Sequence, residues 1–246
     1  MFRENLYEKI FKFNQYERDR WVSEQARRLP SGWRILDVGA GSCPYRSYFR
    51  HCIYKTHDFT ELSKEQLIGN SGYGQIDYVS DIVSIPVEDA SYDAILCTEV
   101  LEHVPEPIRA LKEFYRILKP TGKLLLTAPL GSGIHQEPYH YYGGYTPYWY
   151  LKFLTENAFE KIEIVPNSGF FKHFGQESIR FVRMTAPWRI ETDRRWQLGW
   201  APFWMILLPV FLIFLPALCY IMDPLDKSKF FTVGYHVAAR KADGRQ

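Results

Sequence analysis

The residues with the clearest capacity for chemistry form a glycine turn within Arg34–Tyr45, RILDVGAGSCPY. The apolar run before Gly39 and Gly41 predicts a strand, and Pro44 after them predicts the first turn of a helix. Because glycine has no Cβ, the backbone of such a turn can approach a bound molecule closely. The turn lacks the third glycine of a dinucleotide fingerprint, where Pro44 stands, and it lacks the Gly-Lys-Ser/Thr of a P-loop. It is therefore a binding turn of another kind, or a tight strand-to-helix turn of some other α/β protein.

An acidic residue, Asp37, stands on the strand two residues before this Gly-x-Gly. In this combination the chain resembles the class I S-adenosylmethionine-dependent methyltransferases, in which the turn contacts the amino-acid half of the cofactor. The resemblance implies S-adenosylmethionine as the cofactor, with Asp37, Gly39 and Gly41 in its binding site.

A second acidic residue, Asp58, follows the next apolar run, Ile53–His57. The carboxyl end of the second strand is where a ribose with two hydroxyls can be bound, because one carboxylate accepts two hydrogen bonds. We therefore predict that Asp58 binds the ribose. The other interpretation is an exposed aspartate in a turn.

The longest stretch of resemblance is Ile76–Val104, IDYVSDIVSIPVEDASYDAILCTEVLEHV. It is similar to the same methyltransferases in its acid before an apolar residue, its proline-containing loop and its long apolar strand. The resemblance implies that Asp81 accepts from the adenine amino group and that the backbone of Ile82 meets the ring edge. An adenine needs such an acceptor beside an apolar slot. Glu99 follows the predicted strand, at the edge where open α/β sheets bind ligands, and is included in the cofactor site.

Glu99, Glu102 and His103 also form the string E-x-x-E-H. Some quinone-pathway O-methyltransferases carry a similar string and are thought to hold a divalent cation with it. In many other members of this large family, a histidine in Leu-Glu-His-Val is a packed core residue without a metal. We therefore assign no metal site from the sequence.

The stretch after the fifth predicted strand is rich in histidine and tyrosine. In class I methyltransferases the loop at this place commonly borders the acceptor. A neutral histidine can take the proton of a hydroxyl near pH 7, which makes His140 and then His135 the candidate catalytic bases. Each could equally be a histidine satisfied within a tyrosine-rich loop. Glu137–Tyr139 and Tyr145–Pro147 resemble a subset of bacterial methyltransferases from surface-glycan and lipid pathways.

Strands and helices alternate around these residues. The pattern predicts an α/β protein with a Rossmann-like, doubly wound, seven-stranded and mostly parallel sheet, whose antiparallel last strand is Phe231–Ala239. Helical spacing of apolar residues near the N-terminus predicts a helical lid over residues 1–30. The methyltransferase domain is expected at residues 31–166 and 231–246.

Residues 167–230 are a predicted hydrophobic insertion between the sixth and seventh strands. Gly199–Met222 carries no charge and is long enough to span a bilayer, with arginines before it. A single crossing would separate the seventh strand from its sheet, and Pro202, Pro209 and Pro216 would break the segment. We expect a bent helical hairpin in the cytoplasmic leaflet, with the arginines at anionic headgroups. A homodimer interface and a buried core hairpin are the alternatives.

The composition agrees with a globular protein. The 246 residues are 46% hydrophobic and 24% charged, and the net charge of +2 is too small to indicate a nucleic-acid partner. Four cysteines without C-x-x-C spacing indicate neither a zinc site nor disulfides. The charged N-terminus has no signal-peptide core, so a cytoplasmic location is expected.

These patterns predict an S-adenosylmethionine-dependent methyltransferase that is peripheral, or monotopic, on the cytoplasmic membrane face. Its acceptor would be a hydroxyl on a membrane-associated glycan, glycolipid or polyprenyl-linked sugar. One alternative is a quinone-type aromatic O-methyltransferase that uses a divalent metal. Another is a non-catalytic, cofactor-binding membrane adaptor. The sequence leaves open the acceptor, the atom that is methylated and the oligomeric state.

Overall fold

The structure, a computed structural model, describes residues 5–67, 72–189 and 193–244. The chain divides into two compact units. The first is built from Arg18–Val165 and the C-terminal strand, and the second from Pro166–Val233 and the residues before Arg18. Helix α2 (Phe13–Arg27) begins in the second unit and ends in the first. The predicted boundaries of lid, domain and insertion stay a prediction.

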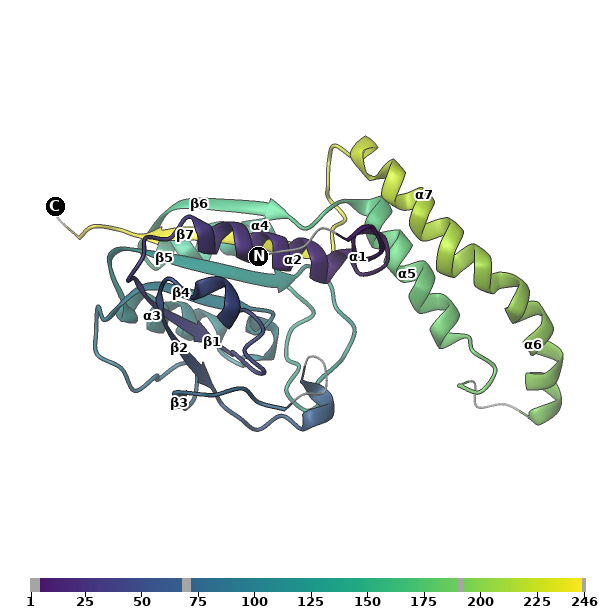
Figure 1. The fold of residues 1–246 in the computed structure, drawn as a ribbon, viewed down its shortest axis with the longest axis horizontal. Coiled ribbons are helices and arrows are strands. Elements are labelled where there is room, and N and C mark those ends of the chain that lie inside the picture. The colour runs from purple at the N-terminus through teal and green to yellow at the C-terminus, as the bar shows by residue number, and fades with distance from the viewer. Residues whose placement is uncertain (1–4, 68–71, 190–192, 245–246) are drawn as a thin grey trace. The chain divides into compact units, whose positions relative to one another are not determined.

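The first unit contains a seven-stranded sheet in the order β3-β2-β1-β4-β5-β7-β6 (Figure 1). Strand β1 pairs in parallel with β2 and β4, and β7 pairs antiparallel with β5. The predicted Rossmann-like α/β fold, mostly parallel with an antiparallel last strand, is confirmed. The strands are β1 (Arg34–Val38), β2 (Ile53–Asp58), β3 (Tyr78–Val79), β4 (Tyr92–Thr98), β5 (Leu118–Pro129), β6 (Phe159–Pro166) and β7 (Gly234–Lys241).

Two hydrophobic clusters contain the buried side chains of this sheet. In one, Leu111 and Phe114 of α3 (Pro107–Ile117) and Leu154 of α4 (Pro147–Glu156) join buried residues of β1, β4, β5 and β7. In the other, Trp21 and Val22 of α2 join different residues of β1, β4 and β5. Because successive strand residues point to opposite faces, the sheet is covered on both sides, as the doubly wound pattern predicted.

Regular structure after the glycine turn is shorter than predicted. Pro44 does not open an α-helix, and only a 3-10 turn over Arg46–Phe49 follows, without a side-chain cap. The reason is local, because Cys43 has a φ of 58°, a left-handed conformation that cannot start a right-handed helix. The third strand has only two residues, and β5 begins at Leu118, directly after α3.

The insertion between β6 and β7 is helical, as expected, but its prolines do not break it, and Gly199–Met222 is not itself the bent hairpin that we expected. A continuous helix runs from Arg194 to Leu225. Leu215 N donates to the carbonyl of Val210, five residues earlier, so the helix contains a π-turn between Pro209 and Pro216. The helices of this unit are α1 (Leu6–Phe11), α5 (Phe170–Met184), α6 (Arg194–Pro209), the π-turn η5 (Val210–Phe214), α7 (Leu215–Met222) and a 3-10 turn (Asp223–Leu225).

Helix α5 packs along α6 and α7. Ser178 Oγ donates to the carbonyl of Phe211 at 2.9 Å, and the indole N–H of Trp204 donates to the carbonyl of Val182 at 3.0 Å. The helix Arg194–Leu225 has 32 residues and, among the described residues, is the one helix long and apolar enough to cross a membrane. Only 11% of its most apolar window is buried, so this pairing leaves most of its apolar surface exposed.

Candidate active site

The glycine turn follows β1 and closes back onto β2. The amides of Gly39 and Ala40 donate to the carbonyl of His57 at 2.9 and 3.0 Å. Gly39 has a φ of 70° and Gly41 a φ of 51°, a conformation that favours glycine. A Cβ on Gly39 would lie 2.3 Å from Val100 Cγ2, so no larger residue fits there. The turn lies at the carboxyl edge of the sheet, where α/β proteins of this type bind ligands.

Asp58 ends β2 beside that turn. Its Oδ2 accepts from Gly41 N at 2.8 Å and its Oδ1 from Thr60 N at 3.0 Å. The structure thus brings together two residues that the sequence assigned to the cofactor. Each carboxylate oxygen keeps a lone pair for a further hydrogen bond, so the residue fits the predicted contact with a ribose, which stays a prediction.

Asp37 is nearly inaccessible, with 1% of its surface exposed. Its carboxyl accepts a short hydrogen bond from the hydroxyl of Tyr54 on the neighbouring strand β2. Burial raises the pKa of Asp37 to about 7, and the charge of Asp58 acts in the same direction. Asp37 therefore joins β1 to β2 through Tyr54. This contact explains its burial without a direct contact to the cofactor.

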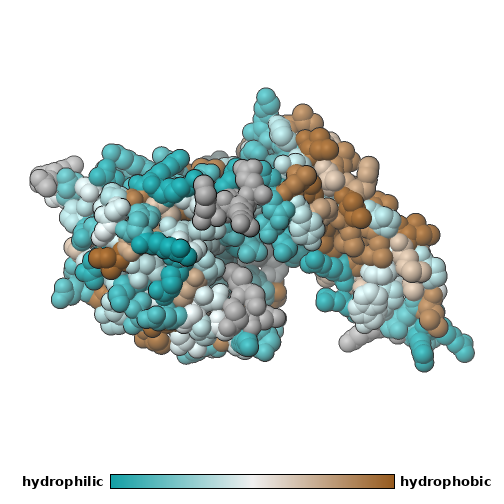
Figure 2. Space-filling model, viewed as in Figure 1, coloured by the Kyte–Doolittle hydropathy of each residue, from teal (hydrophilic) through white to brown (hydrophobic). Residues whose placement is uncertain are grey.

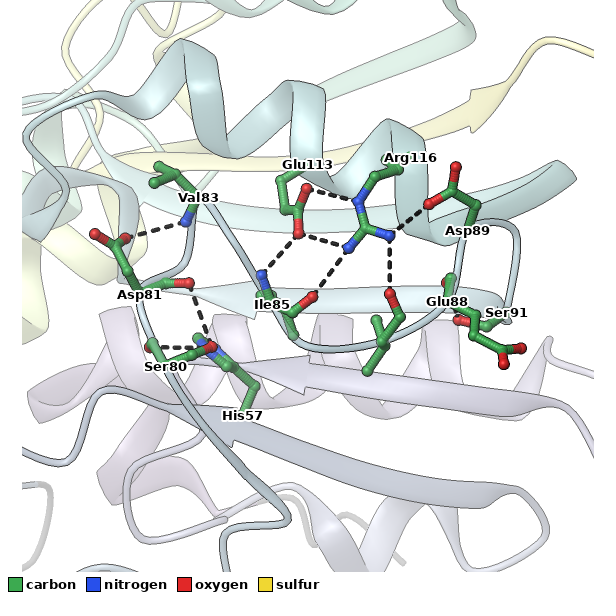
Figure 3. Close-up of polar contacts among 11 residues, drawn as sticks. His57, Ser80, Asp81, Val83, Ile85, Glu88, Asp89, Ser91, Glu113 and Arg116 are labelled. Carbon is green, nitrogen blue, oxygen red and sulfur yellow. Dashed lines mark hydrogen bonds and ion pairs between the residues drawn. The ribbon is translucent and has the colours of Figure 1, made fainter.

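The predicted adenine residues Asp81 and Ile82 lie in the loop after β3. Asp81 Oδ1 accepts from Val83 N at 3.1 Å, and the side chain of Ile82 is buried. Behind them His57 Nε2 lies 2.9 Å from the carbonyl of Ser80 (Figure 3). Burial lowers the pKa of His57, so the neutral ring donates its Nε2–H to that carbonyl. His57 thereby fixes the start of the loop, a role that the sequence did not indicate.

Two residues of α3 hold the rest of this loop, and we call Glu113 and Arg116 the loop clamp. Glu113 Oε1 accepts from Ile85 N and from the guanidinium of Arg116, both at 2.7 Å. Arg116 donates to the carbonyls of Ile85 and Val87 at 3.0 and 2.8 Å, and pairs with Asp89 at 2.6 Å (Figure 3). The clamp satisfies backbone groups that irregular structure would otherwise leave unpaired. Helical i,i+3 spacing of an acid and an arginine is too common to reveal it from sequence.

Glu99 lies at the carboxyl end of β4 with a φ of 53°. Its Oε1 accepts from Thr127 Oγ1 at 2.8 Å, and its Oε2 pairs with the guanidinium of Arg18 at 3.0 Å. Arg18 comes from α2, is buried, and also donates to the hydroxyl of Tyr45 at 3.2 Å. Arg18 could not be recognised from the sequence, because a single arginine in an amphipathic helix usually faces water.

Three histidines meet beyond the ends of β4 and β5. The ring centroids of His103, His135 and His140 lie 4.7 to 5.7 Å apart. Burial and the two neighbouring imidazoles lower the pKa of His103 to about 4, and burial lowers the pKa of His140. His140 Nε2 lies 3.1 Å from Ser132 Oγ. The structure therefore joins both predicted bases to a third histidine that the sequence assigned to no catalytic role.

Comparison with known proteins finds similar domains and folds. A methyltransferase domain family matches residues 36–126, the part that contains the glycine turn, Asp58, Asp81 and Glu99. The fold is similar to that of a putative sarcosine dimethylglycine methyltransferase from Galdieria sulphuraria, with a TM-score of 0.55, 16% identity, and coverage of 92% of this chain and 86% of that one. It is also similar to a putative methyltransferase from Bacillus halodurans, with a TM-score of 0.52, 17% identity, and coverage of 91% and 98%.

Residues 36–126 therefore match a methyltransferase domain, and the sheet has the predicted Rossmann-like topology. Both findings support the predicted class and its cofactor, S-adenosylmethionine. The open glycine turn with Asp58 beside it fits that cofactor.

Two curated proteins are similar to this chain in sequence. The ubiquinone biosynthesis O-methyltransferase of Xanthomonas axonopodis pv. citri is 35% identical over 108 residues, which are 42% of this chain and 45% of that protein. The demethylmenaquinone methyltransferase of Bacillus subtilis is 23% identical over 212 residues, 74% of this chain and 91% of that protein. The chain thus spans about half the length of the first of these relatives.

We predict that the loop clamp sets the affinity for the cofactor. Arg116→Met leaves the carbonyls of Ile85 and Val87 without their donor and leaves Glu113 without its cation. A lost partner at such a site costs about 1–3 kcal/mol, which corresponds to a rise in the dissociation constant of roughly 5- to 150-fold. Calorimetric titration with S-adenosylhomocysteine measures it, and hydrogen exchange over residues 80–91 reports the loosened loop.

The matched control for the clamp is Arg109→Met. Arg109 lies on the same helix and pairs with Glu106, but it is exposed. It should bind the cofactor product as the wild type does. Equal affinities of the Arg116 and Arg109 variants, with unchanged exchange in the loop, would show that the clamp has no part in binding.

We also predict a pH-dependent effect of Asp37→Asn on stability. Because the folded pKa of Asp37 is about 7 and the ordinary value is 3.8, its contribution to stability is full below about pH 4 and is lost as the pH rises through about 7. Asparagine keeps an acceptor for Tyr54 but does not titrate. The unfolding free energy of the variant should therefore rise relative to that of the wild type between pH 4 and 7, by about 4 kcal/mol at most. Above pH 7 the difference between the two should stay constant.

Denaturant unfolding at a series of pH values measures this difference. Glu160→Gln, at an exposed carboxylate on β6, is the control and should give no such trend. A difference between the Asp37 variant and the wild type that does not change with pH would contradict a titrating, buried Asp37.

Proposed function

We propose that the protein is an S-adenosylmethionine-dependent methyltransferase whose acceptor is a hydroxyl group carried on a membrane lipid. The observation that carries the proposal is the presence, in one chain, of a methyltransferase domain and of the exposed apolar helix Arg194–Leu225. An acceptor with a long lipid tail stays in the bilayer. An enzyme for such an acceptor therefore has to reach the membrane surface.

The cofactor supplies an electrophilic methyl group on a sulfonium. The open backbone of the glycine turn would receive its amino-acid half, and Asp58 and Asp81 would accept from the ribose hydroxyls and the adenine amino group. These three places follow one another along the carboxyl edge of β1, β2 and β3. Glu99 borders the same edge at the end of β4, with its charge balanced by Arg18.

His140 is our candidate for the catalytic base, with His135 as the second candidate. Methyl transfer is an in-line displacement, so most of the rate comes from holding the acceptor in line and excluding water. A base adds about 10²–10⁴-fold by taking the hydroxyl proton as the oxygen–carbon bond forms. Burial keeps the pKa of His140 below its ordinary value of 6.5, so its ring is neutral and able to take a proton at pH 7.

Two acceptor classes fit a hydroxyl on a lipid. We favour an aromatic hydroxyl on a prenylated quinone precursor, because the curated relatives are named for ubiquinone and menaquinone biosynthesis. A lipid-linked glycan is the second candidate. The exposed rings of Tyr141 and Tyr142, in the loop that carries both candidate bases, favour it because flat aromatic faces pack well against sugar rings.

The membrane contact that we propose is the apolar hairpin face, defined as the exposed side chains Phe203, Ile206, Ile213, Phe214 and Ile221. Each is at least half exposed. Figure 2 shows hydrophobic side chains gathered over α6 and α7. The exposed indoles of Trp188 and Trp196 lie close in sequence to Arg189, Arg194 and Arg195. Tryptophan and arginine together are typical of the zone between lipid tails and anionic headgroups.

A surface location follows better from this arrangement than a crossing. Helix α5, which packs along the apolar helix, carries Lys172, Arg180 and Arg183, and such residues are costly in the hydrocarbon core. The chain must also return to β7 in the same sheet. We therefore propose a peripheral protein on the cytoplasmic membrane face. Coverage of the same face by a second copy of the chain is the competing explanation.

For activity, we expect the purified full chain to convert S-adenosylmethionine to S-adenosylhomocysteine when membrane lipids are supplied. The methylated lipid should gain the mass of one CH₂ and partition with prenylated quinone precursors. His140→Ala should lower kcat about a hundredfold or more. His51→Ala, at an exposed histidine on the other side of β2, should leave kcat unchanged.

Two other outcomes of this assay would change the proposal. Methylation of lipid-linked glycans alone would move the acceptor to our second class. Cofactor binding without any S-adenosylhomocysteine, across both classes of lipid, would identify a non-catalytic membrane adaptor and contradict the proposal.

For membrane binding, we expect the wild type to float with liposomes, more strongly when they contain anionic lipid. Replacing Ile206, Ile213 and Ile221 together by glutamate should lower the bound fraction at least tenfold, because each change loses apolar burial of about 1.5–3 kcal/mol and adds repulsion. Ile53→Glu, at an isoleucine on β2 that is about half exposed, is the control and should float normally. A wild type that ignores liposomes, but dimerises through the same isoleucines in size-exclusion chromatography, would contradict the membrane proposal.

A further inference from the structure

The histidine cluster contains a group of side chains with the arrangement of a metal site. Three ligand atoms lie within 4.8 Å of one another, one each from Glu102, His103 and His135. Glu102 and His103 belong to the 3-10 turn Leu101–His103 after β4, and His135 belongs to the loop after β5. The three donors therefore come from two strand ends that the sheet holds side by side.

Both imidazoles are oriented by backbone carbonyls. His103 Nδ1 lies 2.5 Å from the carbonyl of Tyr139, and His135 Nδ1 lies 2.9 Å from the carbonyl of Gly133. Because a carbonyl only accepts, each Nδ1 carries the proton and each Nε2 keeps its lone pair. Metal-binding histidines are commonly fixed in this way, with one nitrogen on a carbonyl and the other on the ion.

Glu102 supplies an independent observation. Its side chain is 1% exposed, and its Oε2 has no hydrogen-bond partner among the residues that the structure describes. Its Oε1 lies 3.7 Å from His103 Nε2. A buried carboxylate with an unpartnered oxygen is costly, and a cation bound to this carboxylate and to the two imidazoles would offset that cost.

We propose that Glu102, His103 and His135 form a binding site for one divalent transition-metal ion of the zinc class. Two imidazoles and one carboxylate suit such borderline ions, whereas Mg²⁺ prefers oxygen ligands alone. Metal–ligand bonds of about 2.1 Å in a tetrahedron set ligand atoms roughly 3.4 Å apart, so the group has to close by a little over 1 Å. Three protein ligands leave a fourth position for the oxygen of water or of an acceptor.

This ligand set differs from the string E-x-x-E-H of the sequence. Glu99 is held by Arg18 and Thr127 and is absent from the group, and His135 takes its place. His140 stands beside the group with its Nε2 on Ser132 Oγ. The site can therefore hold an ion while His140 stays free of it.

Metal binding by the full chain, without cofactor or acceptor, tests this site separately from methyl transfer. The chain is first stripped with a chelator and then titrated with Zn²⁺ against a competing chelator, and with Co²⁺ as a coloured probe. We expect one ion per chain, with the visible Co²⁺ spectrum of a low-coordinate nitrogen and oxygen site. An excess of Mg²⁺ should not displace the ion.

Three variants make the test specific. His135→Asn, at an exposed loop position, and Glu102→Gln, which keeps the side-chain shape, should each weaken Zn²⁺ binding at least a hundredfold. His51→Asn removes a histidine elsewhere and should bind as the wild type does. Absence of binding by the wild type, or equal binding by the wild type and both site variants, would overturn the proposal. Circular dichroism of each variant confirms that it is folded.

Discussion

The antiparallel pairing of β7 with β5 is the constraint on which the rest of the structure depends. Seven residue pairs join the two strands, from Lys123 with Arg240 to Pro129 with Gly234, and β7 lies between β5 and β6. The chain therefore leaves the sheet after β6 and returns to its neighbouring position. Whatever lies between is attached at both ends to adjacent strands, so a long apolar insertion is tolerated but a single membrane crossing is not. The fit is close, because a Cβ on Gly234 would lie 2.5 Å from the carbonyl oxygen of Ala128.

The same sheet explains why the site can be precise although it is built from loops. Its ligand-binding positions are turns at the carboxyl ends of parallel strands, and turns have backbone groups to satisfy. Buried polar side chains meet that need: His57 binds Ser80, and the loop clamp of Glu113 and Arg116 binds the backbone of residues 85 and 87. Arg18 balances Glu99 in the same way. Each of these contacts joins residues far apart in sequence, so the loops are held by the packed core.

The sequence predicted the sheet, and the strand ends at which the candidate cofactor residues lie, because both depend on local patterns. Apolar runs, the Gly-x-Gly turn and acidic residues at strand ends can each be recognised from neighbouring residues in the sequence. In the structure, Gly41 and Asp58 are joined by a hydrogen bond. Sequence patterns did not predict the features that depend on contacts between distant parts of the fold. The helix expected at Pro44 is replaced by a 3-10 turn that follows the left-handed residue Cys43, and the long apolar helix continues past its prolines, with a π-turn before Pro216. The meeting of His103 with His135 depends on two strand ends that lie side by side, and no spacing in one chain encodes that.

The apolar hairpin face would cost free energy if it were left exposed to water. A large apolar side chain left fully in water forgoes about 1.5–3 kcal/mol, so five that are each more than half exposed together forgo roughly 5–9 kcal/mol, a large part of the stability of a domain. Such a face is therefore expected to be covered. A bilayer offers an apolar interior and an anionic surface together, which matches a face whose flanking segment carries Arg189, Arg194 and Arg195 beside exposed indoles. A second copy offers the apolar surface but brings the same arginines with it. The charge next to the face, more than the face itself, favours a membrane over a partner chain.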